Sequence, residues 1–256
     1  MQELILRFTI KFKKYISHSM NLTHFFLGLL EGDGSLQVNH WKKRILQFRI
    51  VIKLKYTQHN YQMLVQLRDH LQCMKVHVRH NAVLLIENDQ KAIHKLCFLF
   101  EKFPFLTQRK RQQYAFLHYC LTHKPSISEY MYLKTGKLHL PGKILHPHVD
   151  EILARVYYPS WLSGFIEAEG CFCVRQNGQQ SFSIGQKNDP CIILSIKKYF
   201  AFQNKIQEKK NQMYVLEGGH RQVLGRMIAF FQKYPLLGEK HRSFLTFVER
   251  YTTPKP

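Results

Sequence analysis

Two short acidic segments of the chain resemble each other and are well placed to do chemistry. The first spans residues 26–34 and reads F-L-G-L-L-E-G-D-G, and the second spans residues 161–170 and reads W-L-S-G-F-I-E-A-E-G. Each joins an apolar helical run to an acid–small–acid–Gly ending, which aligns Asp33 with Glu169 in the other half of the chain. The repetition indicates a duplicated unit, each copy of which ends in a carboxylate.

The small residues inside each segment are spaced by four, which puts them on one face of a helix. Small side chains allow two helix backbones to approach closely. We therefore expect the two motif helices to pack together, so that Asp33 and Glu169 emerge side by side. The small residues are Gly28 and Gly32 in the first segment and Gly164 and Ala168 in the second.

A carboxylate at the end of a helix is unfavourable beside the negative pole of the helix dipole unless a cation binds there. Mg²⁺ is commonly held by one or two carboxylates, with water and phosphate oxygens as the other ligands. Two such ions about 3.5–4 Å apart can activate water and stabilise the leaving oxygen in phosphodiester hydrolysis. The pair Asp33 and Glu169 therefore predicts a Mg²⁺ site, and a neighbouring Lys or Arg would neutralise phosphate charge.

The composition favours a polyanionic partner. The 256 residues include 38 Lys and Arg against 17 Asp and Glu, a formal net charge of +21, which suits nucleic acid or an anionic surface. No apolar run is long enough to cross a bilayer, so we expect no membrane span. The six cysteines form no C-x-x-C pair and are expected to be reduced thiols.

The chain divides into two similar halves. We expect repeat 1 over residues 21–123 and repeat 2 over residues 159–256, each ordered as helix, two strands, helix, two strands and further helices. Residues 124–158 are rich in Pro, Gly and polar side chains and are expected to link the halves. Residues 1–20 are expected to form a basic arm or leader. This pattern predicts an α+β fold.

Alternating apolar and polar residues mark the strands. Over residues 46–56 the even positions are apolar and several odd positions are basic or amide side chains, the pattern of a sheet with one face on the core. Several strands sharing such a face suit a nucleic-acid platform. The expected DNA-binding residues are Ser35, Gln37, Asn39, Gln47, Arg49, Lys55, Lys75, His77, Arg79, Cys173, Arg175, Asn177, Ser181, Ser183, Lys187, Lys205, Gln207 and Lys209.

With these motifs the chain resembles a LAGLIDADG homing endonuclease of the single-chain, two-motif kind, over residues 22–251. The two motifs, the strands after each, and Pro-Phe-Leu and Pro-Leu-Leu triplets at equal spacing before Arg109 and Lys240 carry the resemblance. It implies a monomer of two units related by a pseudo-twofold axis, with the motif helices at the interface. The two curved antiparallel sheets would form a saddle over duplex DNA, and both strands would be cut across the minor groove.

The resemblance also implies roles for single residues. Asp33 and Glu169 would bind the catalytic metal, for which Mn²⁺ could substitute, whereas Ca²⁺ would support binding without cleavage. Aligning F-R-I-V-I-K with F-S-I-G-Q-K puts Ile52 opposite Gln186, so Lys53 or Lys55 is expected to substitute in repeat 1. The further implied roles are support of the helices by Glu31 and Glu167, positioning of the attacking water by Gln186, and basic side chains near the scissile phosphates at Arg109 and Lys240.

Three functions remain open at this stage. The first is a site-specific DNA endonuclease, expected to be encoded in a mobile intron of an organelle, the mitochondrion rather than the chloroplast. The second is an RNA maturase that assists splicing of its own group I intron RNA, and the third is a DNA-binding regulator that has lost cleavage. The presence of both motif acids favours the first over the third.

Overall fold

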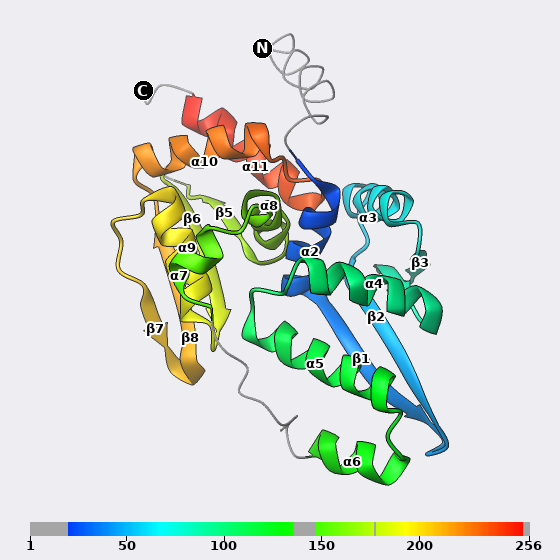
Figure 1. Cartoon of the computed structure of the whole chain (residues 1–256). Coiled ribbons are helices and arrows are strands. Elements are labelled where there is room, and N and C mark those ends of the chain that lie inside the picture. Colours follow the sequence, from blue (N-terminus) through cyan, green and yellow to red (C-terminus); the bar gives the residue numbers. More distant parts are fainter. Residues whose placement is uncertain (1–19, 136–146, 177, 253–256) are drawn as a thin grey trace.

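The computed structural model describes residues 20–135, 147–176 and 178–252. Two units lie on either side of a central pair of helices (Figure 1). The first unit consists of α2 (Leu22–Asp33), β1 (Gly34–Trp41), β2 (Ile45–Lys55), α3 (Gln58–Leu71), β3 (Lys75–Arg79), β4 (Ala82–Glu87), α4 (Gln90–Lys102) and α5 (Gln108–His123).

The second unit repeats this order with shorter strands. It consists of α8 (Tyr158–Glu169), β5 (Cys171–Val174), β6 (Gln180–Lys187), α9 (Pro190–Phe200), β7 (Gln207–Lys209), the 3₁₀ turn η1 (Lys210–Gln212), β8 (Met213–Gly218), α10 (Arg221–Lys233) and α11 (Glu239–Thr252). The antiparallel sheets have the equivalent orders β1-β2-β4-β3 and β5-β6-β8-β7, which confirms the expected α+β fold of two similar units.

The central helices α2 and α8 touch backbone to backbone, as the small residues predict. A Cβ atom added at Gly28 would collide with the carbonyl oxygen of Trp161, and one added at Gly164 would collide with that of Phe25. The Asn21 side chain accepts hydrogen bonds from the amides of the first turn and so fixes the start of α2. Both motif helices therefore end side by side at the centre of the molecule.

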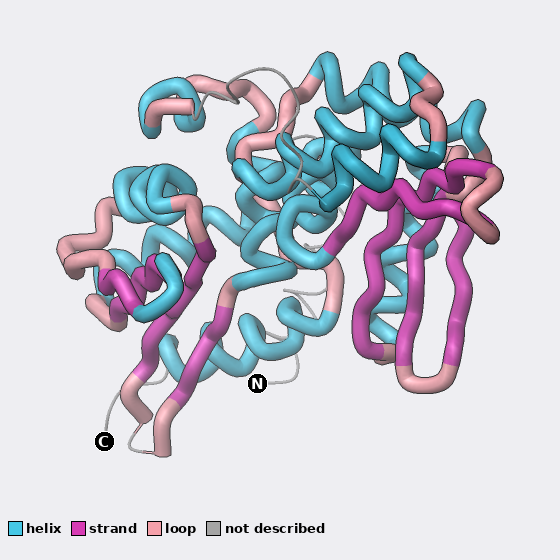
Figure 2. Tube along the Cα trace, turned by 90° about the horizontal axis from the view of Figure 1, so that it is seen from below, coloured by secondary structure: helices cyan, strands magenta, loops and turns pink. Residues whose placement is uncertain are grey.

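Helices cover the apolar side of each sheet, and Figure 2 shows the strands of the two sheets on opposite sides of the central helices. In β2 the even positions Ile50 and Ile52 are fully buried, whereas Arg49 and Lys53 are exposed. The start of α3 is fixed locally, because the Thr57 side chain accepts a hydrogen bond from the amide of Asn60 at 3.2 Å.

The segment between the units also has structure. Residues 124–158, expected as a linker, contain α6 (Ile127–Thr135), α7 (Val149–Leu153) and the first residue of α8. The fully buried Tyr130 fixes α6 to the first sheet, because its hydroxyl donates to the carbonyl oxygen of Val38 at 2.9 Å. The basic arm, apart from Met20, lies outside the described residues. No helix in the described ranges is long and apolar enough to span a bilayer.

Candidate catalytic centre

The two motif acids meet at the ends of the central helices. Asp33 is the last residue of α2 and Glu169 the last residue of α8, and a Cβ added at Gly32 would lie 3.2 Å from Cγ of Glu169. Partial burial and the neighbouring Glu169 carboxylate raise the pKa of Asp33 to about 6. Desolvation likewise raises the pKa of Glu169. The structure thus brings together two carboxylates whose ionisation is unfavourable without additional positive charge.

Two basic side chains flank this pair symmetrically. Arg109 donates from Nη2 to the carbonyl oxygen of Gly32 at 2.8 Å. In the second unit, Lys240 donates from Nζ to the carbonyl oxygen of Ala168 at 2.5 Å. Gly32 and Ala168 each precede a motif acid, so the two contacts are equivalent. Both charges lower the pKa of Asp33 and of Glu169, against the effect of burial.

The first acid of each motif holds the loop that carries the basic residue. Glu31 is fully buried and accepts hydrogen bonds from the backbone amides of Leu106 and Thr107, the latter at 2.6 Å. Glu167 accepts in the same way from the amides of Leu237, Gly238 and Lys240, each at 3.1 Å. The carboxylates thus bind the amides that precede and begin α5 and α11, where the helix dipole favours negative charge.

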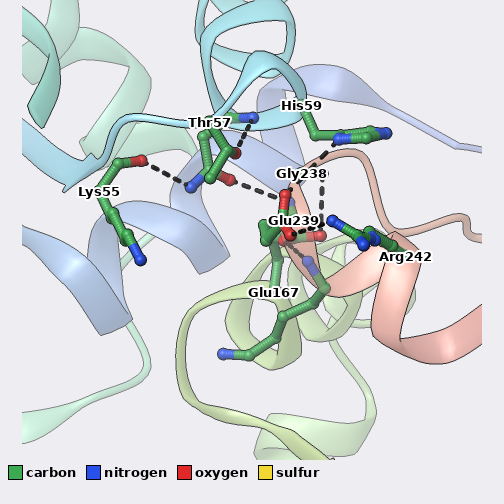
Figure 3. A network of polar contacts seen from close by, with 9 residues as sticks. Lys55, Thr57, His59, Glu167, Gly238, Glu239 and Arg242 are labelled. Carbon is green, nitrogen blue, oxygen red and sulfur yellow. Dashed lines mark hydrogen bonds and ion pairs between the residues drawn. The ribbon is translucent and has the colours of Figure 1, made fainter. Parts of the chain in front are cut away.

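Each unit also contributes an acceptor to the basic helix of the other. Oδ2 of Asp189, the residue before α9, accepts the amide of Gln108 at 2.6 Å. Oδ1 of Asn60, in the first turn of α3, accepts the amide of Glu239 at 2.9 Å. Figure 3 shows the second contact region, in which His59 of the first unit also lies 3.5 Å from the carboxylate of Glu239 in the second. These crossed contacts fix both basic helices relative to both units.

A third basic residue belongs to the centre although the sequence did not single it out. Lys110 is fully buried, and its Nζ donates to the carbonyl oxygen of Gly34, the residue after Asp33, at 2.6 Å. Burial, with a smaller effect of Arg109, lowers the pKa of Lys110 to about 7, while Asp33 and Glu169 oppose the shift. His241 follows Lys240 as Lys110 follows Arg109, so the second unit has no lysine at the equivalent position.

Strand register corrects one expected equivalence. Gly34 pairs with Ile52, and continuing the pairing of Cys171 with Ser183 by one residue brings Gly170 opposite Ile184. The helix caps agree, because Thr57 and Asp189 precede α3 and α9. Leu54, not Ile52, therefore stands where Gln186 stands, and Lys55, not Lys53, corresponds to Lys187. A slip of two residues preserves the alternation of faces, so periodicity could not detect it.

Gln186 and Lys53 lie on opposite faces of their respective sheets. Gln186 is only 7% exposed and shares the core side of β6 with Phe182 and Ile184. Its strand pairs with β5, which begins two residues after Glu169. Lys53 is exposed on the polar side of the first sheet, opposite Leu84. The catalytic roles of both residues stay predictions.

The expected DNA-binding residues of the first unit share one face. Gln37 pairs with Arg49, and Asn39 pairs with Gln47, so their side chains lie on the same side of the sheet. The same alternation includes Ser35, Lys55, Lys75, His77 and Arg79, all exposed or half-exposed. This face is continuous from the edge strand β1 to the edge strand β3.

The second sheet has a smaller and less basic face. Cys173 pairs with Ser181, and Lys209 pairs with Met213, which in turn pairs with Lys187. Ser181 is only 8% exposed, and Glu217 brings an acid onto this face, 3.6 Å from Arg175. Ser183 and Gln207 lie on the same side of the sheet as these residues. Lys205 precedes β7, and Asn177 lies outside the described residues.

Comparisons with known proteins agree with this architecture. The sequence profile of the LAGLIDADG endonuclease family matches residues 26–120 and 162–251. A probable intron-encoded endonuclease aI3 of Dictyostelium citrinum is 36% identical over 245 residues, 93% of this chain and 98% of the relative. A protein of the same name from Debaryomyces hansenii is 32% identical, and the match covers 88% of this chain but 37% of that longer relative.

A solved structure extends the comparison to the fold. The LAGLIDADG meganuclease I-CpaMI, bound to uncleaved DNA, superposes with a TM-score of 0.74 at 17% identity and covers 90% of each chain. Its two-unit fold is that of the present protein. The matching profile, which falls on both repeats, and the Dictyostelium relative together establish that this chain belongs to the LAGLIDADG endonuclease family.

Proposed function

We propose that the protein is an intron-encoded homing endonuclease that makes a double-strand break in a long duplex DNA target by Mg²⁺-dependent phosphodiester hydrolysis. The observation that carries the proposal is the meeting of Asp33 and Glu169 between Arg109 and Lys240. Two acids and two bases, one of each from either unit, suit a centre that acts on both strands of a pseudo-twofold substrate.

The donor set fits a hard divalent cation. Two carboxylates lie at adjacent helix ends, and desolvation raises the pKa of both, so a bound cation would favour their ionised forms. Among the described residues, no three or more His, Cys, Asp or Glu side chains lie close enough together to hold a metal ion. Further ligands of the cation would therefore be oxygen atoms of water, backbone or phosphate. That is the ligand set Mg²⁺ prefers. When bound, the ions would activate water and stabilise charge on the leaving oxygen.

The chain's own residues have separable tasks in this proposal. Asp33 and Glu169 hold the cations, and Glu31 and Glu167 keep the loops before α5 and α11 in place. Arg109 donates hydrogen bonds and stays charged at any working pH, so it can stabilise phosphate charge but cannot transfer a proton. Gln186 is proposed to orient the attacking water in the second unit, where the first unit has Leu54.

The two exposed sheet faces are proposed to bind the DNA major groove on either side of the cut. Support comes from the run of Arg49, Lys55, Lys75 and Arg79 along one face. I-CpaMI, which has this fold, is described as bound to uncleaved DNA. Because many phosphates would be contacted, binding should weaken steeply with salt. The intron-encoded relatives in Dictyostelium and yeast support an organellar, mitochondrial origin.

The test is selection of cleaved sites from a randomised duplex library with Mg²⁺. The proposal expects one long site to be enriched and cut on both strands, with the same site bound but uncut in Ca²⁺. Splicing of the host intron in vitro by a protein that cuts no duplex would instead favour the maturase. Binding to one site without either activity would favour a DNA-binding regulator.

A further inference from the structure

The tip of the hairpin joining β1 and β2 is an exposed patch that the proposed catalytic function does not use. Trp41 and Ile45 are 50% and 63% exposed, and the two residues pair across the strands. Alternation places them on the same face as Asn39 and Arg49. The patch is thus a continuation, at the outer end, of the face proposed to bind DNA.

Three consecutive basic residues, Lys42, Lys43 and Arg44, form the turn between these strands, and all are exposed. The amide of Arg44 donates to the carbonyl oxygen of Trp41 at 2.9 Å, which closes the turn. Nζ of Lys42 lies 4.8 Å from the centre of the Trp41 ring. The tip therefore combines a flat apolar pair with a cluster of positive charge.

The backbone of this turn would suit other residues better. Lys42 has φ of 48° and Lys43 has φ of 53°, a conformation that glycine and asparagine adopt at lower cost than lysine. Where both central residues of a hairpin turn have positive φ, Asn-Gly is strongly preferred. In the second unit the corresponding turn places Gly178 at positive φ. Lysine therefore occupies both positions in the first unit at a conformational cost that glycine or asparagine would avoid.

A helix outside the repeats adds charge to the same edge. Lys134 of α6 extends past the edge strand β1, and its Nζ lies 3.5 Å from Oδ1 of Asn39, on the exposed face. The buried Tyr130 holds it there, accepting from the same Nζ at 2.7 Å. Figure 1 shows α6 near the outer end of β1 and β2. In the described part of the second unit, which ends with α11, no helix corresponds to α6.

We infer that this hairpin tip, with Lys134, is an additional site for the sugar–phosphate backbone of duplex DNA, beyond the part of the target that the paired sheets cover. The inference rests on the proposed DNA-binding function and deepens it. Lys42 and Lys43 contact phosphates, while Trp41 and Ile45 pack on deoxyribose. The bound DNA is consequently covered further on the side of the first unit than on the side of the second.

The deciding variant is the double substitution Lys42→Asn/Lys43→Gly, which keeps the turn and removes both charges. Binding to a short random-sequence duplex is measured in EDTA over a range of salt. The slope of log affinity against log salt should flatten by about 2, since each phosphate contact contributes ~0.9. The midpoint of thermal unfolding should be unchanged or higher. The matched control Lys91→Gln/Lys95→Gln removes two exposed charges from α4 and should leave the slope unchanged.

Tryptophan fluorescence provides an independent measurement on the unmodified protein. The chain has two tryptophans, and Trp161 is fully buried, so quenching by neutral acrylamide reports Trp41. The quenching constant should fall when the duplex is added. An unchanged quenching constant, or a salt slope of the double variant equal to that of the wild type, would overturn the inference. Either result would leave cleavage by the central acids untouched.

Discussion

The carboxylate of Asp189 accepts the backbone amide of Gln108 at 2.6 Å, so the second unit caps the helix that carries the basic residues of the first. Asn60 makes the reciprocal contact to Glu239. The proposed catalytic centre lies at the ends of α2 and α8, so the basic side chains beside it must keep fixed positions relative to both helices. The crossed caps meet that need because neither basic helix can shift without breaking a contact to the other unit.

Replacing Asp189 by alanine should reduce both stability and cleavage. The change leaves a half-buried amide without its acceptor, at a cost of about 1 kcal/mol or more in the free energy of unfolding. The measurement is urea unfolding together with the single-turnover cleavage rate. The control Asp89→Ala removes the N-cap hydrogen bond of α4, in which Oδ1 accepts the amide of Ala92 within the same unit. Equal losses of cleavage in both variants, at equal losses of stability, would argue against a positioning effect.

Ionisation of Asp33 should destabilise the metal-free protein. Its pKa is raised from 3.8 to about 6, so the folded chain binds more protons than the unfolded chain between these values, and stability falls as the pH rises through this range. Asp33→Asn should therefore be more stable than the wild type at about pH 8, with the difference vanishing near pH 4. Asp69→Asn, at an exposed acid paired with Arg68, should change stability little.

The buried ammonium of Lys110 should tune the pH dependence of cleavage. Its charge lowers the pKa of Asp33 and of Glu169. Lys110→Met should therefore move the acid limb of the cleavage rate to higher pH, by about one unit, with DNA affinity nearly unchanged. Lys95→Met, at an exposed position of α4, is the control. An acid limb identical to that of the wild type would remove Lys110 from the electrostatics of the centre.

Arg49 should affect which bases are read and not the chemistry. Its Nε donates to Oδ1 of Asn88 at 2.9 Å, and the side chain lies on the exposed face beside Gln37. Arg49→Ala should relax discrimination at a few base pairs by about 1–3 kcal/mol, with a normal rate on the best remaining site. Profiling of the cleaved library measures this directly. Arg68→Ala, on α3 and paired with Asp69, should leave the profile unchanged, and an unaltered profile for Arg49→Ala would refute the face assignment.

Much of the architecture could be predicted because it follows from local patterns. The four-residue spacing of Gly28 and Gly32, repeated in Gly164 and Ala168, predicted the close contact of the motif helices. Alternation over residues 46–56 predicted which side of β2 is buried. The equal spacing from each proline triplet to Arg109 and Lys240 predicted equivalent positions, which the contacts to Gly32 and Ala168 confirm. Each of these features repeats with a fixed period or a fixed offset.

Features that depend on contacts between the units could not be predicted in this way. In the run Thr-Gln-Arg-Lys-Arg any of three basic residues could point inward, and only the start of α5 at Gln108 directs Lys110 to the carbonyl of Gly34. The Asp-Pro pair at residues 189–190 signals a helix start, but its acceptor role toward Gln108 is a tertiary contact. The equivalence of Gln186 with Leu54 required the strand register.

The central claim is that Asp33 and Glu169 together hold the metal that cuts both strands. It is tested most directly by measuring cleavage and binding of the selected duplex by Asp33→Asn and Glu169→Gln. The account predicts that each variant yields no linear product from a supercoiled plasmid in Mg²⁺, while the dissociation constant for the duplex in Ca²⁺ changes by less than about tenfold, or ~1.4 kcal/mol. Linear product formed by Asp33→Asn at the wild-type rate would contradict it.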